Sequence, residues 1–207
     1  MRTLLIIDVQ NDFLPGGALE VPGSDTIVPV INRLVGGFDL VVAAQDWHPA
    51  GHGSFASSHP GRAPFERIDL NGLEQTLWPD HCVQGSRGAE VSADLYTRGV
   101  EAIFRKGMDP AIDSYSAFFD NGRRKATGLA DFLRGRGARE LWLCGLAGDI
   151  CVHYSAKDAL DQGFTVNFVL DAATALDAAR EDAHLAAMRE RGARIVTSGE
   201  VPGEATR

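Results

Sequence analysis

Residues 141–151 read LWLCGLAGDIC, a stretch that passes from an apolar run through two glycines into a more polar segment. Its first four residues are continuously apolar, as expected of a strand covered on both faces of a parallel sheet. Gly145 and Gly148 permit a tight turn. The helical pattern over 149–162 ends before Gly163, a residue typical of helix C-termini. The stretch therefore predicts a strand, a sharp turn and a helix, which is the repeating unit of an α/β fold.

The same alternation extends along the chain in both directions. Short apolar runs predict strands at 3–8, 39–45, 101–105, 139–145, 164–170 and 193–197. Helical spacing predicts helices at 24–34, 127–134, 149–162 and 180–191. Ser24 is the expected N-cap of the first helix. We expect a single domain over residues 1–207: a three-layer α/β/α fold around a central, mostly parallel six-stranded sheet.

The composition excludes several classes of protein. The chain has 207 residues, 44% of them hydrophobic, and a formal net charge of -8. This charge argues against nucleic acid or an anionic membrane surface as a partner, and no apolar run approaches the ~18 residues of a membrane helix. The three cysteines, Cys82, Cys144 and Cys151, have no disulfide-framework spacing. A reducing cytoplasm is the expected compartment.

Three reactive side chains follow predicted strands. Asp8, Lys106 and Cys151 each lie at or just past a strand's carboxyl end, where open parallel sheets bind ligands. Cys151 would sit in the first turn of a helix, where free amides favour a thiolate and can bind an oxyanion. An acid, an amine and a thiol in one cleft would suffice for cysteine-based amide hydrolysis. Taken singly, each also has an ordinary structural interpretation: a turn acid, a solvated lysine and a core thiol.

A second group of polar residues has metal-ligand chemistry. Asp46 and His48 close the second predicted strand, and residues two apart in extended chain point to the same side. A third ligand could come from His52, His59 or His81. One carboxylate with two imidazoles suits zinc, iron or manganese. The alternative is a surface aspartate beside a histidine that packs near a tryptophan.

Several sequence blocks, in order, resemble the nicotinamidases of the isochorismatase-like cysteine hydrolase family over nearly the whole chain. The blocks are DVQNDF at 8–13, PGGAL at 15–19, QDWHP at 45–49 with His52 and SF at 54–55, WPDHCVQG at 78–85, RKG at 105–107, DSYSAF at 113–118, and GLA at 145–147 through CV at 151–152. The resemblance implies an isochorismatase-like hydrolase fold. It also implies hydrolysis of nicotinamide to nicotinate and ammonia through a cysteine thioester, in NAD salvage, with pyrazinamide as a side substrate.

The resemblance also assigns roles to matching positions. It implies a catalytic triad of Asp8, Lys106 and Cys151, and one divalent metal ion held by Asp46, His48 and His81. The family leaves His52 either as a further ligand or as a neighbour of the metal. Zinc is the first expectation for the ion, with iron or manganese as alternatives. A homo-oligomer is a base-rate expectation.

Further positions match the family's substrate pocket. The implied ring-lining residues are Phe13, Trp78 and Tyr115. The implied oxyanion hole consists of the amides of Ala147 and Cys151, with a cis peptide before Ala147. Gly148 departs from the pattern, since members often carry threonine there.

Three alternatives compete with this interpretation. The nearest is a related cysteine amidohydrolase that acts on another small amide, such as a carbamoyl compound or a ureide. A second is a nucleotide-binding or flavodoxin-like protein, but no phosphate-binding glycine motif follows any strand. A third is a catalytically dead binding protein, which loss of the thiol or the base would mark; both are present.

Overall fold

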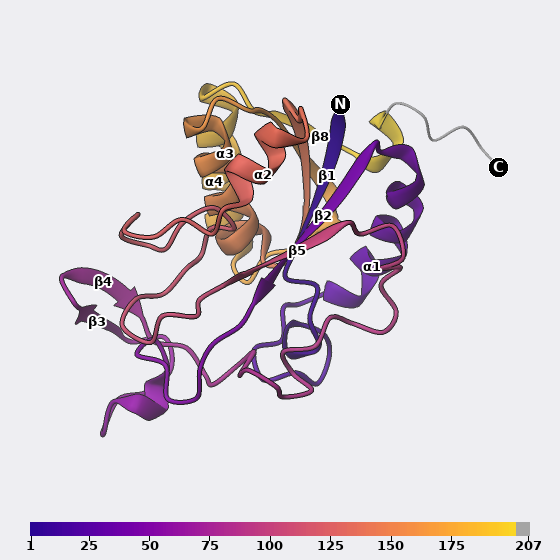
Figure 1. Cartoon of the computed structure of the whole chain (residues 1–207). Coiled ribbons are helices and arrows are strands. Elements are labelled where there is room, and N and C mark those ends of the chain that lie inside the picture. The colour runs from indigo at the N-terminus through magenta and orange to yellow at the C-terminus, as the bar shows by residue number, and fades with distance from the viewer. Residues whose placement is uncertain (202–207) are drawn as a thin grey trace.

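The sheet at the centre of the protein contains all six predicted strands. In this computed structural model, which describes residues 1–201, these strands are β1 (Arg2–Ile7), β2 (Leu40–Asp46), β5 (Ala102–Lys106), β6 (Glu140–Gly145), β7 (Thr165–Ala173) and β8 (Arg194–Val196) (Figure 1). Their order across the sheet is β5-β2-β1-β6-β7-β8, and every neighbouring pair is parallel. The α/β fold with a parallel six-stranded sheet is confirmed, and β7 extends beyond its predicted end at residue 170.

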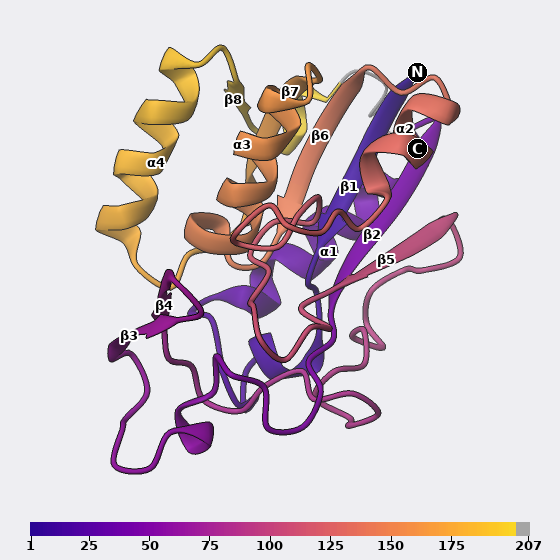
Figure 2. The ribbon, with the colours of Figure 1, turned by 60° about the vertical axis from the view of Figure 1, so that its left-hand side comes forward.

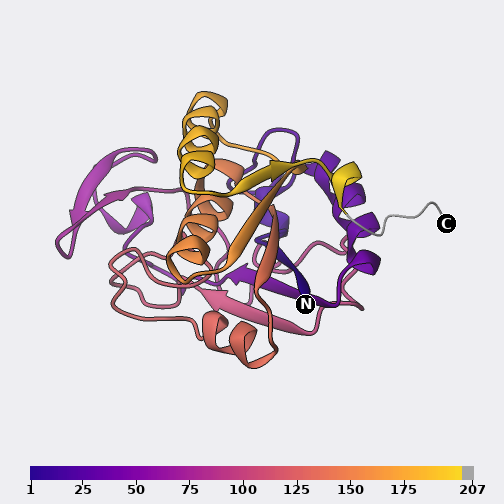
Figure 3. The same ribbon diagram turned by 90° about the horizontal axis from the view of Figure 1, so that it is seen from above.

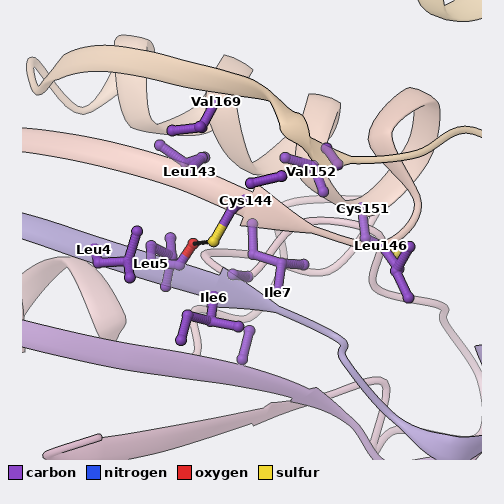
Figure 4. Packing of buried hydrophobic residues seen from close by; sticks show 14 of the residues in the cluster. Leu4, Leu5, Ile6, Ile7, Leu143, Cys144, Leu146, Cys151, Val152 and Val169 are labelled. Carbon is purple, nitrogen blue, oxygen red and sulfur yellow. Dashed lines mark hydrogen bonds between the residues drawn. The ribbon is translucent and has the colours of Figure 1, made fainter. Parts of the chain in front are cut away.

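The strand order decides where a binding site can form. From β1 the chain adds β2 and β5 on one side, then crosses to β6, β7 and β8 on the other. The two halves diverge between β1 and β6, and ligands bind at such a switch point outside the carboxyl ends of the strands. Residues 4–7 of β1 are almost completely buried, because this central strand is covered on both faces (Figure 4).

Helices cover both faces of the sheet. α1 (Ser24–Leu34) lies on one face, and α2 (Leu129–Gly135), α3 (His153–Asp161) and α4 (Ala178–Glu190) lie on the other (Figures 2 and 3). This is the expected three-layer arrangement. The expectation that residues 1–207 form a single domain stays a prediction, and residues 202–207 lie outside those described.

The N-cap of α1 and the starts of the other three helices differ from prediction; α2 begins at Leu129 rather than 127, and α4 at Ala178 rather than 180. The N-cap of α1 is Gly23 in a left-handed conformation, and Ser24 is the buried first residue of the helix. Glycine adopts a positive φ without steric cost, so no side-chain cap is needed to turn the chain there. The predicted helix 149–162 begins as a π-helical turn, Gly148–Val152, before α3 starts.

The long segments after β2 and β5 carry little regular structure. The first contains a short hairpin that we did not predict, β3 (Arg67–Leu70) and β4 (Leu73–Thr76), which projects from the body of the protein (Figure 1). Brief 3-10 turns lie at Asn11–Phe13, Val35–Gly37, Ala56–Ser58 and Ser198–Glu200. Among residues 1–201 there is no helix with the length and apolarity needed to span a bilayer.

Candidate active site

Asp8, Lys106 and Cys151 meet at the carboxyl edge of the sheet. Lys106 Nζ lies 2.9 Å from Asp8 Oδ2 and 3.5 Å from Cys151 Sγ. The same ammonium donates hydrogen bonds to Asp46 Oδ1, at 3.1 Å, and to the carbonyl of Ser114, at 3.0 Å. All three triad residues are at least 92% buried, with exposures of 0, 2 and 8% respectively. A thiol, a carboxylate and a cation therefore lie in contact with one another in a buried site.

Backbone conformation brings the nucleophile and the acid together. Asp8 follows β1 with a φ of 53°, and Gly145 ends β6 with a φ of 117°. A Cβ at Gly145 would lie 2.0 Å from the carbonyl oxygen of Ile7, so only glycine lets the two strand ends approach so closely. The π-helical turn then directs Cys151 back toward Lys106. Figure 4 shows the contrast with Cys144, whose sulfur lies between β1 and β6, 3.8 Å from the Leu5 carbonyl.

The charges in the site suit proton transfer from sulfur to carboxylate. Burial raises the pKa of the Cys151 thiol well above its ordinary value, and a hydrogen bond with Asp8 adds to the rise. Burial also raises the pKa of Asp8, and the nearby Asp46 charge acts in the same direction. Burial disfavours the Lys106 ammonium, but Asp46 and Asp8 outweigh it and hold its pKa well above the usual range. The raised pKa of Cys151 favours a thiol over the thiolate expected from a helix N-terminus, and the Asp8 carboxylate is placed to accept its proton.

The turn before the nucleophile presents a backbone donor. The Leu146–Ala147 peptide is cis, as the resemblance implied. Within residues 1–201 the Ala147 amide donates no hydrogen bond, while its carbonyl accepts from the amides of Ile150 and Val152. A free amide beside the sulfur is the kind of donor that stabilises an oxyanion.

Asp46, His48 and His81 form a compact, buried group with metal-ligand chemistry. Nε2 of His48 lies 2.9 Å and Nε2 of His81 lies 3.3 Å from Asp46 Oδ2. The ligating atoms of the three residues are all within 4.8 Å of one another. Burial disfavours ionisation of Asp46, but His48 and Lys106 hold its pKa well below the usual value, so the carboxylate is charged.

In His48 and His81, a hydrogen bond at Nδ1 orients the ring so that Nε2 faces Asp46. His48 Nδ1 lies 2.9 Å from the carbonyl of Gly107, and His81 Nδ1 lies 2.8 Å from the carbonyl of Pro79. A carbonyl can only accept, so Nδ1 carries the proton in both rings. Nε2 of each ring then faces Asp46 Oδ2, so that a cation between them could take two imidazole nitrogens and a carboxylate oxygen as ligands. The donor set therefore fits a divalent metal ion.

His52 lies beside this group, but its ring nitrogens have other partners. Its Nε2 is 2.7 Å from the carbonyl of Asp109, and its Nδ1 is 2.8 Å from Ser54 Oγ. Its ring packs against His48 with 4.5 Å between centroids. His48, His52 and Asp113 also form a second group of mutually close ligand atoms. With both nitrogens occupied, we propose that His52 supports His48 rather than binding the ion.

Gly107 gives a direct test of the His48 contact. A Cβ at this position would lie 2.5 Å from His48 Cε1, and its φ of 68° disfavours any side chain. Gly107→Ala should displace the imidazole and weaken metal affinity about 10-fold, the usual effect of losing a partner behind a metal ligand. Titration of metal into purified apoprotein measures this.

Gly137→Ala is the matched control, because Gly137 has a φ of 76° with nothing within 4 Å of a Cβ. The two variants share the backbone strain and differ in the clash. Equal metal affinity in the two variants would show that displacing the His48 ring does not affect the ion, and would reject His48 as a ligand.

A narrow cavity lies over the sulfur, with a volume of about 30 Å³. Phe13, Trp78 and Tyr115 line it, as the resemblance implied, together with residues from the triad and the metal group. Further lining residues that the sequence analysis did not single out are Leu19, Asp113, Ser114, Ile150 and Leu176. Leu19, Asp113 and Ser114 fall inside the sequence blocks that resemble the family, so the sequence could have indicated that they lie near the site. Leu176 falls in no motif.

The departure at Gly148 has a structural counterpart. A Cβ there would lie 2.3 Å from Glu181 Oε1, a buried oxygen on α4 without a hydrogen-bond partner in the described part of the chain. The Glu181 side chain therefore occupies the space that a side chain at position 148 would take.

The fold and the site together define an α/β protein of the cysteine hydrolase class. The isochorismatase domain family model matches residues 2–200. The chain belongs to this family.

Several relatives within this family have names that state an activity. The chain is 52% identical over 174 residues to a nicotinamidase of Escherichia coli (strain K12), a match that covers 82% of this chain and 81% of the relative. An Acinetobacter baumanii nicotinamidase/pyrazinamidase superimposes with a TM-score of 0.94 at 42% identity, covering 96% and 97% of the two chains. A Pyrococcus horikoshii pyrazinamidase in complex with zinc gives a TM-score of 0.78 at 36% identity, covering 95% and 98%.

Proposed function

We propose that this protein is a nicotinamidase, an amidohydrolase that converts nicotinamide and water to nicotinate and ammonia in NAD salvage. One observation carries the proposal: Lys106 Nζ lies within 3.5 Å of Cys151 Sγ and 2.9 Å of Asp8, beneath an aromatic cavity and beside a metal-ligand group. The names of the relatives support the same substrate class. Pyrazinamide, which has the same ring and carboxamide layout, is the expected side substrate.

Asp8 begins the reaction by accepting the proton of Cys151. The thiolate then attacks the carboxamide carbon, and Lys106 stabilises the charges of the pair. The amides of Ala147 and Cys151 hold the developing oxyanion, an effect worth about 3–4 kcal/mol for a strong donor. Asp8 returns the proton to the leaving nitrogen, and ammonia departs from a Cys151 thioester.

Hydrolysis of the thioester uses the same residues in reverse order. Asp8 takes a proton from water as the water attacks the acyl carbon. The oxyanion again lies at the Ala147 and Cys151 amides. Collapse of this intermediate releases nicotinate and returns the proton to the sulfur.

The pocket walls orient the ring. Phe13 and Trp78 would contact its faces, with Tyr115 beside them. A divalent ion held by Asp46, His48 and His81 would supply a Lewis-acid contact for the ring nitrogen and a positioned water. Zinc is the proposed ion, with iron and manganese as the other metals that this ligand set accepts. Orientation of this kind turns binding energy into rate.

Ammonia release tests the proposal. Purified protein should hydrolyse nicotinamide, and pyrazinamide more slowly, with at least about 100-fold preference over a ureide or carbamoyl amide that lacks the ring. Chelation should abolish the activity, and zinc, iron or manganese should be compared for its return. A metal-loaded protein that releases ammonia only from the non-aromatic amides would transfer the assignment to a related amidohydrolase.

The proposal includes a cytoplasmic location and assembly as a symmetric homo-oligomer. All three cysteines are free and buried, which supports a reducing compartment. Fractionation and sedimentation measurements test the two statements separately.

A further inference from the structure

Asp149 is a buried carboxylate close to the nucleophile with no role in the chemistry above. It lies in the π-helical turn, two residues before Cys151, and is 0% exposed. Its Oδ1 accepts the amide of Leu176 at 2.9 Å, and its Oδ2 accepts the amide of Asp177 at 3.0 Å. Arg180 Nε donates to the same Oδ2 at 2.8 Å. One side chain thus ties the β7–α4 connection to the turn that carries the sulfur.

Backbone and side-chain contacts reinforce this junction. The Gly148 amide donates to the Thr174 carbonyl at 2.7 Å. His184 Nδ1 lies 3.1 Å from the Asp149 carbonyl, and Glu181 rests over Gly148. The segment 174–177 and the first turns of α4 are therefore docked on the nucleophile turn from one side.

The docked segment forms a wall of the substrate cavity. Leu176 lines the cavity, and Ile150, from the nucleophile turn, lines it as well. The cavity is narrow, with a volume of about 30 Å³, so the position of Leu176 in its wall limits the size of the ring that the cavity admits. Leu176 is half-buried and lies outside helices and strands. Its backbone amide is held by the Asp149 carboxylate.

We infer that Asp149 is a positioning residue that fixes Leu176 in the wall of the ring pocket, and so sets how large a ring substituent the enzyme accepts. The inference rests on the proposed function. Its physical basis is the need for two acceptor oxygens: one carboxylate serves two backbone amides and a guanidinium at once. An asparagine has one acceptor oxygen, so Asp149→Asn confronts at least one donor with an amino group.

The first test compares two matched variants. Asp149→Asn should raise the KM for nicotinamide about 10-fold, which corresponds to ~1.4 kcal/mol, and change kcat less. The ratio of kcat/KM for nicotinamide over a methyl-substituted nicotinamide should fall. Asp158→Asn is the control, because Asp158 is also a buried carboxylate, on α3, and pairs with Arg123 outside the pocket. If the role of Asp149 is only structural, both variants should have a lower melting temperature, and the ratio of kcat/KM for the two nicotinamides should stay at the wild-type value in each. That result would overturn the inference.

The second test does not depend on the substrate. Iodoacetamide labelling of Cys151, followed by peptide mass mapping, should be several-fold faster in Asp149→Asn than in wild type or Asp158→Asn, because the wall opens more often. A protein inactive on nicotinamide that still shows this difference would reject the proposed function and keep the positioning role. Equal labelling rates would reject the role itself.

A third variant tests the inference even if Asp149→Asn does not fold. Leu176→Ala leaves the carboxylate and its contacts intact and shortens the wall. It should narrow the ratio between the two nicotinamides and speed Cys151 labelling. Wild-type values for both measurements would overturn the inference.

Discussion

Replacing Cys151 with alanine is expected to lower nicotinamide turnover by about 10⁴-fold or more, the scale seen when a covalent nucleophile is removed. Without the sulfur there is no thioester, and the cation, the free amide at Ala147 and the metal group are left with no nucleophile to assist. The substitution deletes one buried atom, so the fold should persist. Ammonia release and circular dichroism measure the two effects. Mass spectrometry of wild type, quenched during turnover, should find a nicotinoyl adduct on the peptide that contains Cys151.

Cys144→Ala is the matched control for this experiment. Both thiols are free and buried, but the Cys144 sulfur faces the Leu5 carbonyl inside the core. Its loss should cost about 1 kcal/mol of stability and leave kcat near the wild-type value. Comparable activity in both alanine variants would exclude the covalent mechanism.

The convergence of the triad was predictable because parallel strands place their carboxyl ends at one edge. Asp8, Lys106 and Cys151 each followed a recognisable apolar run, and the order β5-β2-β1-β6 brings those three strand ends together. The protonation state of the sulfur was not predictable, because it depends on burial. A local argument from the helix start favoured a thiolate, and complete enclosure of the site raises the thiol pKa instead.

The sequence predicted only part of the metal-ligand group. Two-residue spacing joined Asp46 to His48, but spacing alone did not choose among His52, His59 and His81, since loop conformation decides which imidazole arrives. In the structure His81 reaches Asp46, whereas His59 Nε2 donates a hydrogen bond to the carbonyl of Gly53 at 2.7 Å.

Contacts between loops could not be predicted from hydrophobic periodicity. Leu176 lies in no motif, and in the cavity wall its amide donates a hydrogen bond to Asp149 that only the folded chain creates. The hairpin β3–β4 was missed although its sequence carries a signal. Arg67–Leu70 alternates polar and apolar residues, and Asn71-Gly72, both with positive φ, form the two-residue turn.

Asp8→Asn should lower kcat/KM for nicotinamide about 10³-fold, within the range for loss of a general base. Asparagine keeps the size and one acceptor oxygen beside Lys106, but it cannot take the proton of Cys151 or pass it to ammonia. Thermal unfolding shows whether the variant remains folded. An adduct on Cys151 that forms at the wild-type rate would contradict the assignment of Asp8 as the base.

The pH profile separates loss of a base from a general disturbance of the site. Asp8 must be unprotonated to accept the thiol proton, so wild-type kcat/KM should fall as pH decreases through its pKa. Burial and the Asp46 charge raise that pKa, which places the acid limb above the pH of 3.8 at which an ordinary aspartate titrates. The limb should disappear in Asp8→Asn and remain in Asp120→Asn, a control at a buried aspartate whose Oδ1 accepts the amides of Gly122 and Arg124. An acid limb that persists in Asp8→Asn would assign it to another group and leave the proton of Cys151 without its proposed acceptor.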